Sequence, residues 1–367
     1  MDDPRLPIAI ETPLAPLHRE AQASLGSWFG CALPNDFGDW RAEFGFARNR
    51  VGLVDKNYRA YLSLIGPDRA RYLNAILTNN IKELAEQHGT VALLLNPQGR
   101  ILAEIETYAL GETLFCVTYL MIRERLIEWL DKYIIMDDVT LRDDSSLWGT
   151  LALEGPLAGA VTKQAAGVDI TSLEDLQSVA ATVGPVPCRV VRRTVGGVAG
   201  AEFVVEHGQL SSLWQALLPL ARENGGGPVG YAALSALRLL QGIPWFGYDF
   251  GEKQIPHEAG LEHSHISYSK GCYTGQEIVE RVRSRGQVNR QRVRLRFSGD
   301  ALPAPDTILT AGGLEAGYVT RAAELPDSSG GIGMGYARRE HHTPGSILEY
   351  PGGTATVIAS ATAATSD

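Results

Sequence analysis

The sequence predicts a mixed α+β protein built from several packed units, and three observations support this. The chain has 367 residues, and a chain of that size is roughly two to three times the usual length of a single domain. One order of strands and helices occurs twice before residue 225. After residue 290, short strands alternate with turn residues and no helical pattern appears. We therefore expect duplicated α/β units followed by a small C-terminal β-barrel.

Residues 1–50 are predicted to form a helical entry segment that packs on the first domain, and residues 51–145 the first α/β unit. Between Tyr58 and Leu64, apolar residues occupy every second position, which is the period of a half-buried strand. GPDRARYLNAIL is predicted to be a helix, and two strands flank the turn NPQGR. A third strand, TLFCVT, and an amphipathic helix, MIRERLIEWLDKY, complete this unit.

The second α/β unit is predicted over residues 146–289 and repeats the first. YLSLIG (61–66) is similar to TLALEG (150–155), and TLFCVT (113–118) is similar to AEFVVE (201–206). The two pairs have nearly the same separation along the chain, and both halves end in an amphipathic helix. We interpret this pattern as an internal duplication of a β-α-β-β-α unit.

The predicted barrel covers residues 290–360. ENGGGP precedes it as a turn, and YAALSALRLLQGIP is a helix that glycine and proline stop. PDSSGGIG is predicted to be a hairpin tip, and the ATAATSD tail is expected to be frayed.

The net charge and the lengths of the apolar runs limit the cellular location of the protein and the partners that it can bind. The net charge of -9 argues against general nucleic-acid binding, because that needs clustered positive charge. The N-terminus has acids where a signal peptide needs bases, and no apolar run approaches the roughly 20 residues of a membrane span. We therefore expect a cytoplasmic protein that does not bind membranes.

The octapeptide KGCYTGQE holds the one cysteine with polar neighbours. None of the four cysteines forms a CxxC pair, so a zinc knuckle or thioredoxin-type motif is not expected. Thr274 and Glu277 have capping-box spacing, which predicts a helix start at Thr274. A helix end and Lys270 near Cys272 would favour the thiolate. The alternative is that Cys272 packs under a turn and has no chemical role.

A file of arginines follows this motif. Four alternate with mostly apolar residues along one predicted strand, and three more precede them at the same spacing: Arg290, Arg292, Arg294 and Arg296, and Arg281, Arg283 and Arg285. In an acidic chain this concentration predicts a site for an anion or an acidic partner. The alternative is that the arginine stems cover apolar surface.

KGCYTGQE resembles the signature of the YgfZ family, folate-binding proteins related to the glycine cleavage T-protein (GcvT, aminomethyltransferase). Four further blocks resemble that group: residues 51–81, LALEGP, residues 242–261 and GLEAGYVTR. The resemblance implies a three-domain fold around a central channel that takes tetrahydrofolate or a one-carbon derivative. It also implies a role in assembling or repairing iron-sulfur clusters, including those of tRNA-modifying enzymes.

The resemblance also implies site residues. Cys272 would be the functional thiol, with Lys270 beside it. The positions matched to folate binding are Thr78, Asn79, Asn96, Asp249, Glu258, Tyr273, Gln276 and Arg283. Asp249 as a turn residue and Glu258 as a surface acid remain the alternatives.

Two departures from the T-protein pattern bear on activity. Ala103 and Glu104 stand where the T-protein has an Asp pair, which argues against aminomethyl transfer, because that chemistry needs a carboxylate beside the reacting amine. Leu240 replaces a pterin-contacting Glu and leaves folate affinity open. His257, His263 and His265 lack the spacing of a metal site, so none is expected.

The leading hypothesis is therefore a tetrahydrofolate-binding accessory protein, not a conventional enzyme, that serves iron-sulfur enzymes or their assembly machinery. One alternative is a folate-dependent aminomethyltransferase or demethylase that uses Glu104 or Asp249. A second is a non-catalytic interaction protein on the same scaffold. The oligomeric state, the form of folate and the client enzymes are left open by the sequence.

Overall fold

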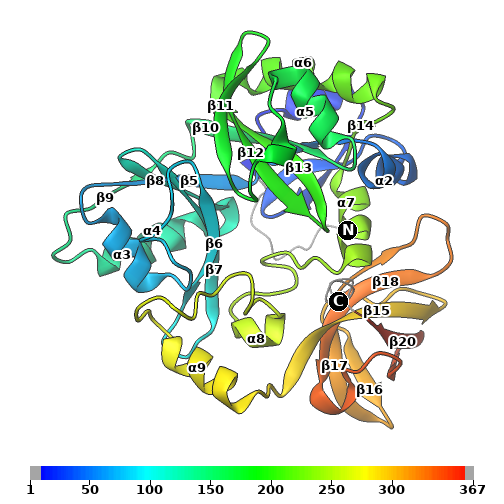
Figure 1. Cartoon of the computed structure of the whole chain (residues 1–367). Coiled ribbons are helices and arrows are strands. Elements are labelled where there is room, and N and C mark those ends of the chain that lie inside the picture. The colour runs from blue at the N-terminus through cyan, green and yellow to red at the C-terminus, as the bar shows by residue number, and fades with distance from the viewer. Residues whose placement is uncertain (1–9, 360–367) are drawn as a thin grey trace. The chain divides into compact units, whose positions relative to one another are not determined.

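Figure 1 shows the computed structural model of the chain, which describes residues 10–359. The chain forms two compact units. The first takes in residues up to 75, 79–92 and 105–234, and the second takes in 76–78, 93–104 and residues from 235 onward. Among the described helices, none has the length and hydrophobicity needed to cross a membrane.

The first unit opens with a small three-stranded sheet and two helices. These are β1 (Ile10–Glu11), α1 (Ala15–Glu20), β2 (Ser24–Trp28), β3 (Cys31–Asp36) and α2 (Trp40–Asn49). Phe29 and Gly30 have φ of 52° and 78°, the left-handed pair that a two-residue hairpin turn requires, so β2 returns directly as β3. The segment predicted to be helical therefore also contains a sheet, because this turn pairs the chain with itself.

A five-stranded sheet follows, in the order β6-β7-β8-β5-β9. Its elements are β5 (Arg59–Ile65), α3 (Arg69–Ile76), β6 (Gly89–Leu95), β7 (Ile101–Leu110), β8 (Thr113–Tyr119), η1 (Leu120–Ile122), α4 (Arg123–Tyr133) and β9 (Thr140–Asp143). The tip of the β6-β7 hairpin, residues 93–104, groups with the second unit.

A six-stranded sheet has the order β11-β12-β13-β10-β4-β14. Its elements are β4 (Gly52–Asp55), β10 (Trp148–Glu154), α5 (Ala158–Ala166), η2 (Ile170–Ser172), β11 (Ser178–Val183), β12 (Val186–Val195), β13 (Val198–Glu206), η3 (His207–Gln209), α6 (Leu210–Glu223) and β14 (Gly227–Pro228). The order β11-β12-β13-β10 reproduces β6-β7-β8-β5, as the predicted duplication requires. Helices α5 and α6 lie beside this sheet (Figure 1) and contact each other and its strands. The buried core here includes Leu151, Phe203 and Leu217.

The described residues of the second unit form most of helix α7, helices α8 and α9, and a closed barrel. Its elements are α7 (Tyr231–Gln241), α8 (Pro256–Ala259), α9 (Gln276–Arg285), β15 (Arg290–Gly299), β16 (Ile308–Ala311), β17 (Leu314–Glu324), β18 (Gly331–Arg338), η4 (Arg339–His341), β19 (Ile347–Tyr350) and β20 (Gly353–Ile358). The barrel closes in the order β15-β18-β17-β16-β19-β20 around Leu295, Leu309 and Leu348. The predicted α+β class and C-terminal barrel are thus confirmed, whereas the ATAATSD tail lies outside the described residues.

Candidate functional site

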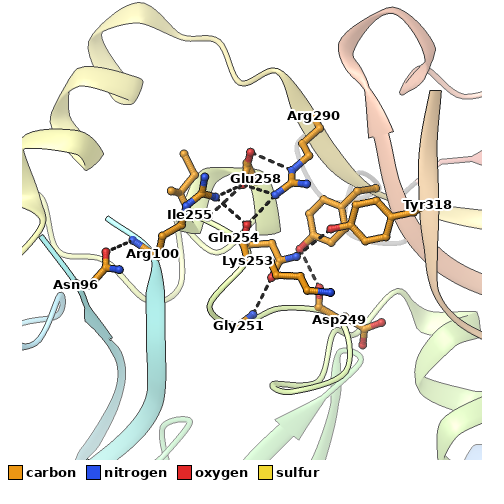
Figure 2. Close-up of polar contacts among 11 residues, drawn as sticks. Asn96, Arg100, Asp249, Gly251, Lys253, Gln254, Ile255, Glu258, Arg290 and Tyr318 are labelled. Atoms are coloured by element: carbon orange, nitrogen blue, oxygen red, sulfur yellow. Dashed lines mark hydrogen bonds and ion pairs between the residues drawn. The ribbon is translucent and has the colours of Figure 1, made fainter. Parts of the chain in front are cut away.

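The β6-β7 hairpin tip is shaped by Asn96. Its Oδ1 accepts the backbone N–H of Gln98 at 3.0 Å and that of Arg100 at 2.9 Å, and Figure 2 shows the second of these contacts. Gly99 completes the turn with φ of 72°. The side-chain oxygen of Asn96, a predicted folate-binding residue, therefore stabilises this turn through hydrogen bonds.

The KGCYTGQE segment lies against this tip through two glycines. A Cβ on Gly275 would come within 2.6 Å of the Asn96 carbonyl oxygen, and one on Gly99 within 2.9 Å of Ile278. Gly275 is the N-cap of α9, with φ of 80° and no side-chain cap. The predicted helix start at Thr274 is therefore wrong, because the contact with the hairpin holds Gly275 in a left-handed conformation that a helix cannot continue through.

Cys272 is the exposed cysteine of the chain, whereas Cys31 and Cys116 are buried and Cys188 is half-buried. Burial raises the pKa of Cys31 and of Cys116 to about 12, so these thiols stay protonated. The N-cap of α9 is Gly275, so Cys272 stands three residues before the N-cap and not two, as the capping box predicted. The exposure of Cys272 favours a chemical role, because a reactive thiol must be reachable.

Lys270 and Tyr273 flank the thiol in sequence. Lys270 Nζ donates to the Leu77 carbonyl and lies 4.9 Å from the centre of the Tyr273 ring. Burial lowers the pKa of Lys270 to about 8. Tyr273 is 7% exposed, and its hydroxyl has no hydrogen-bond partner among the described residues. A buried hydroxyl in this state is suited to donate to a ligand.

The other predicted positions near α9 have local partners. The Arg283 guanidinium lies 4.2 Å from the centre of the Tyr268 ring and 3.5 Å from a Glu280 oxygen. The backbone N–H of Gln276 donates to the Tyr273 carbonyl at 3.2 Å. Arg283 is exposed and Gln276 is half-buried, so both side chains stay reachable from solvent.

Thr78 and Asn79 stabilise backbone. The buried Thr78 hydroxyl donates to the His265 carbonyl at 2.6 Å and accepts the Leu93 N–H at 2.8 Å. Asn79 Nδ2 donates to the Val91 carbonyl at 2.9 Å. Thr78 thus ties the loop before KGCYTGQE to strand β6, and no sequence pattern shows this link.

Asp249 is 1% exposed and lies among polar partners. Its carboxylate accepts from the Arg238 guanidinium, from the Trp245 N–H at 2.9 Å and from the Thr320 hydroxyl at 2.6 Å. This set of bonds ties α7, the loop after it and barrel strand β17 together. Both carboxylate oxygens are already engaged within the second unit.

Glu258, in helix α8, forms ion pairs with two arginines. It lies 3.2 Å from Arg100 Nη1 and 3.1 Å from Arg290 Nε, and it accepts the Ile255 N–H at 3.2 Å (Figure 2). Both arginines also donate to the Lys253 carbonyl at 2.7 Å. The hairpin tip, α8 and the first barrel strand therefore meet at this carboxylate.

Three arginines of the predicted anion surface are structural. Arg290 binds as just described, Arg292 donates to the carbonyls of Ala259 at 2.8 Å and Gly242 at 3.0 Å, and Arg294 donates to the Leu240 carbonyl. The expectation of an anion site along this strand is not met at these positions. The Glu258 carboxylate and backbone carbonyls near α7 and α8 already accept the guanidinium N–H groups. The Leu240 side chain packs against a buried cluster formed by Leu239 of α7 with Leu325, Ile332 and Met334.

One polar pair was not foreseen. His265 Nε2 lies 2.9 Å from Glu104 Oε1, and the two side chains are 11% and 15% exposed. Glu104 and His265 lie 161 residues apart in the chain, so no local pattern in the sequence links them. Among residues 10–359, no three His, Cys, Asp or Glu side chains gather as a metal site would need.

Comparisons with known proteins agree with this architecture. Residues 14–266 match the family described as the GCVT N-terminal domain. The aminomethyltransferase of Streptomyces avermitilis is 27% identical over 341 residues, which cover 91% of this chain and 91% of that protein. The aminomethyltransferase of Moorella thermoacetica is 28% identical over 321 residues, or 86% of each chain.

A solved structure shares the fold. The glycine cleavage system aminomethyltransferase T from Bartonella henselae superposes with a TM-score of 0.85 at 22% identity, covering 96% of this chain and 97% of that one. The part of the sequence-based resemblance that concerns GcvT is thereby confirmed, and the narrower resemblance to YgfZ stays a prediction.

Proposed function

Because this chain belongs to the family of the GCVT N-terminal domain, we propose that it binds tetrahydrofolate or a one-carbon derivative of it. The observation that carries the proposal is that named aminomethyltransferases align over nine tenths of both chains. The unpartnered Tyr273 hydroxyl supports it, because a buried donor without a partner is costly unless a ligand or water satisfies it.

Tyr273→Phe tests this assignment with little change of shape. Calorimetric titration of the wild-type protein is expected to give saturable binding with a Kd below about 100 μM. Loss of the hydroxyl should weaken binding by about fivefold, since one hydrogen bond is worth about 1 kcal/mol. Absence of binding to the wild-type chain would favour a non-catalytic interaction protein on the same scaffold.

The relatives favour aminomethyl transfer as the use of the bound folate. Tetrahydrofolate would supply the nitrogen that receives the one-carbon unit. Glu104, on strand β7 just after the turn at 96–100, would supply the carboxylate at the position where the T-protein pattern has an Asp pair. The contact with His265 supports this role, because it holds the Glu104 carboxylate in one orientation. If so, Glu104→Gln abolishes folate-dependent ammonia release from an aminomethylated carrier, and Cys272→Ala does not.

A second candidate function is an accessory role in iron-sulfur cluster assembly or repair. The resemblance of KGCYTGQE to the signature of the YgfZ family implies this role. Exposure of Cys272 favours it, since a thiol that meets a cluster or a partner must be reachable. Complementation of cells that lack their own YgfZ tests it, with the activity of a cluster-dependent tRNA-modifying enzyme as readout. Rescue by wild type but not by Cys272→Ala is expected, and equal rescue by both would remove the thiol from the function.

A further inference from the structure

We propose that Ser264, His265 and Glu104 form a proton relay that connects solvent with the Glu104 carboxylate. Its use in catalysis rests on the proposed folate-dependent function, whereas its geometry stands on residues of the second unit alone. His265 Nε2 lies 2.9 Å from Glu104 Oε1, and His265 Nδ1 lies 2.7 Å from Ser264 Oγ. Both ring nitrogens are thus within hydrogen-bond distance of a group that can exchange a proton.

Ser264 is the most exposed of the three residues. Ser264 is exposed, whereas the side chains of His265 and Glu104 are 11% and 15% exposed. Water can therefore exchange protons with the serine hydroxyl more readily than with the carboxylate. The relay would therefore add a path to solvent through Ser264 beside the small exposed fraction of the carboxylate itself.

The position of His265 is held by backbone contacts on both sides. Its carbonyl accepts the Thr78 hydroxyl at 2.6 Å, and the same hydroxyl accepts the Leu93 N–H at 2.8 Å. The His265 N–H donates to the Leu261 carbonyl at 3.0 Å. Since Leu93 begins the hairpin tip that carries Glu104, Thr78 fixes the imidazole relative to the carboxylate.

The proton transfer needs only a proton from the solvent as a further reactant. With Glu104 as a carboxylate, Nε2–H of His265 donates to it and Nδ1 accepts the Ser264 hydroxyl proton. Delivery then moves the Nε2 proton to Glu104, the Ser264 proton to Nδ1, and a proton from a hydronium ion in the solvent to Ser264, which leaves a water molecule. The imidazole is neutral before and after and only changes tautomer, and Glu104 becomes a carboxylic acid that can protonate a leaving amine.

His257 provides the contrast within the same segment. Its Nε2 lies 3.2 Å from the Tyr268 hydroxyl, but its Nδ1 is buried and has no partner among the described residues. Such an imidazole can hold a hydrogen bond but cannot pass a proton through. His257→Gln is therefore a matched control for His265→Gln.

The first test does not need activity. In protein labelled with ¹⁵N at histidine, the His265 resonances, assigned by their loss in His265→Gln, should report a neutral ring with the proton on Nε2. Ser264→Ala should shift the His265 Nδ1 resonance and leave those of His257 unchanged. A His265 ring whose nitrogens respond to neither Ser264→Ala nor Glu104→Gln would overturn the relay.

The second test uses folate-dependent ammonia release. His265→Gln keeps a hydrogen bond to Glu104 but cannot relay, so kcat should fall about 100-fold while the Kd for tetrahydrofolate changes less than about threefold. His257→Gln should retain wild-type kcat. A parallel loss of folate binding in His265→Gln would mark a structural role and overturn the proposal. Absence of folate binding in the wild-type chain would instead refute the proposed function and leave the resonance test of the relay standing.

Discussion

Glu106 lies in a buried network of charges in the first unit, and its neutralisation should expose how much this network stabilises the fold. Arg193 Nη2 lies 2.9 Å and Arg59 Nη1 3.5 Å from the Glu106 oxygens, and the Tyr108 hydroxyl donates to the carboxylate at 2.8 Å. Arg59 also makes a two-pronged contact with Glu202 at 2.7 and 2.8 Å. The Glu106 side chain is 10% exposed.

The magnitude follows from the pKa of this carboxyl. Burial alone raises the pKa of Glu106, but Arg193 and Arg59 outweigh burial and hold the pKa at about 2, against an ordinary value of 4.5. That difference corresponds to about 3 kcal/mol of stability at neutral pH. Because the folded pKa is the lower one, this contribution is present above pH 4.5 and is lost as the pH falls toward 2.

Urea denaturation of wild type and Glu106→Gln from pH 7 to pH 3 tests this. The variant should be about 3 kcal/mol less stable at pH 7, and the difference should shrink steadily below pH 4.5. Glu112→Gln is the matched control, because Glu112 is 96% exposed at 3.6 Å from Arg69 and should matter little. A difference between wild type and Glu106→Gln that does not change between pH 5 and pH 3 would refute this account of the network.

Three further predictions concern the second unit. Thr78→Val should lower the free energy of unfolding by about 1–3 kcal/mol, because the Leu93 N–H and the His265 carbonyl both lose their partner. An unchanged Tm would contradict the role of Thr78 in joining these two segments. Gly275→Ala should lower Tm, because φ of 80° strains a residue with a Cβ and the hairpin tip leaves no room for one; Gly271→Ala, where the added Cβ meets nothing within 4 Å, should not. Acylation of Lys270, followed by peptide mass spectrometry, should rise with a midpoint near pH 8, since burial lowers its pKa to about 8; a midpoint above pH 10 would show an ordinary lysine.

Much of the fold is predictable from local pattern. The alternation from Tyr58 to Leu64 gives strand β5, and the glycine pair at 196–197 turns β12 into β13. The duplicated order of strands was visible as well, because equivalent strands keep similar apolar strings. The start of α9 was not predictable, since Gly275 takes its conformation from a contact with the hairpin tip nearly 180 residues earlier.

The arginines after KGCYTGQE show a different kind of error. Their spacing on a strand is correct, and a surface for anions is a reasonable expectation from charge alone. In the structure, Arg292 donates to the carbonyl of Gly242 and Arg294 to that of Leu240, at the end of α7. The partner of a guanidinium depends on the element that packs against it. For Arg292 this element is the end of α7, 50 residues earlier in the chain.

The sequence by itself determined the duplicated order of strands, the C-terminal barrel and the family resemblance, because periodicity, turn residues and motifs are local properties of the chain. Only the tertiary structure decided which polar side chains have partners. It brings Glu104 to His265 across 161 residues and Arg59 to Glu202 across 143. The physical reason is that a buried polar group must find its partner in space, and sheet pairing and helix packing, rather than spacing along the chain, determine who that partner is.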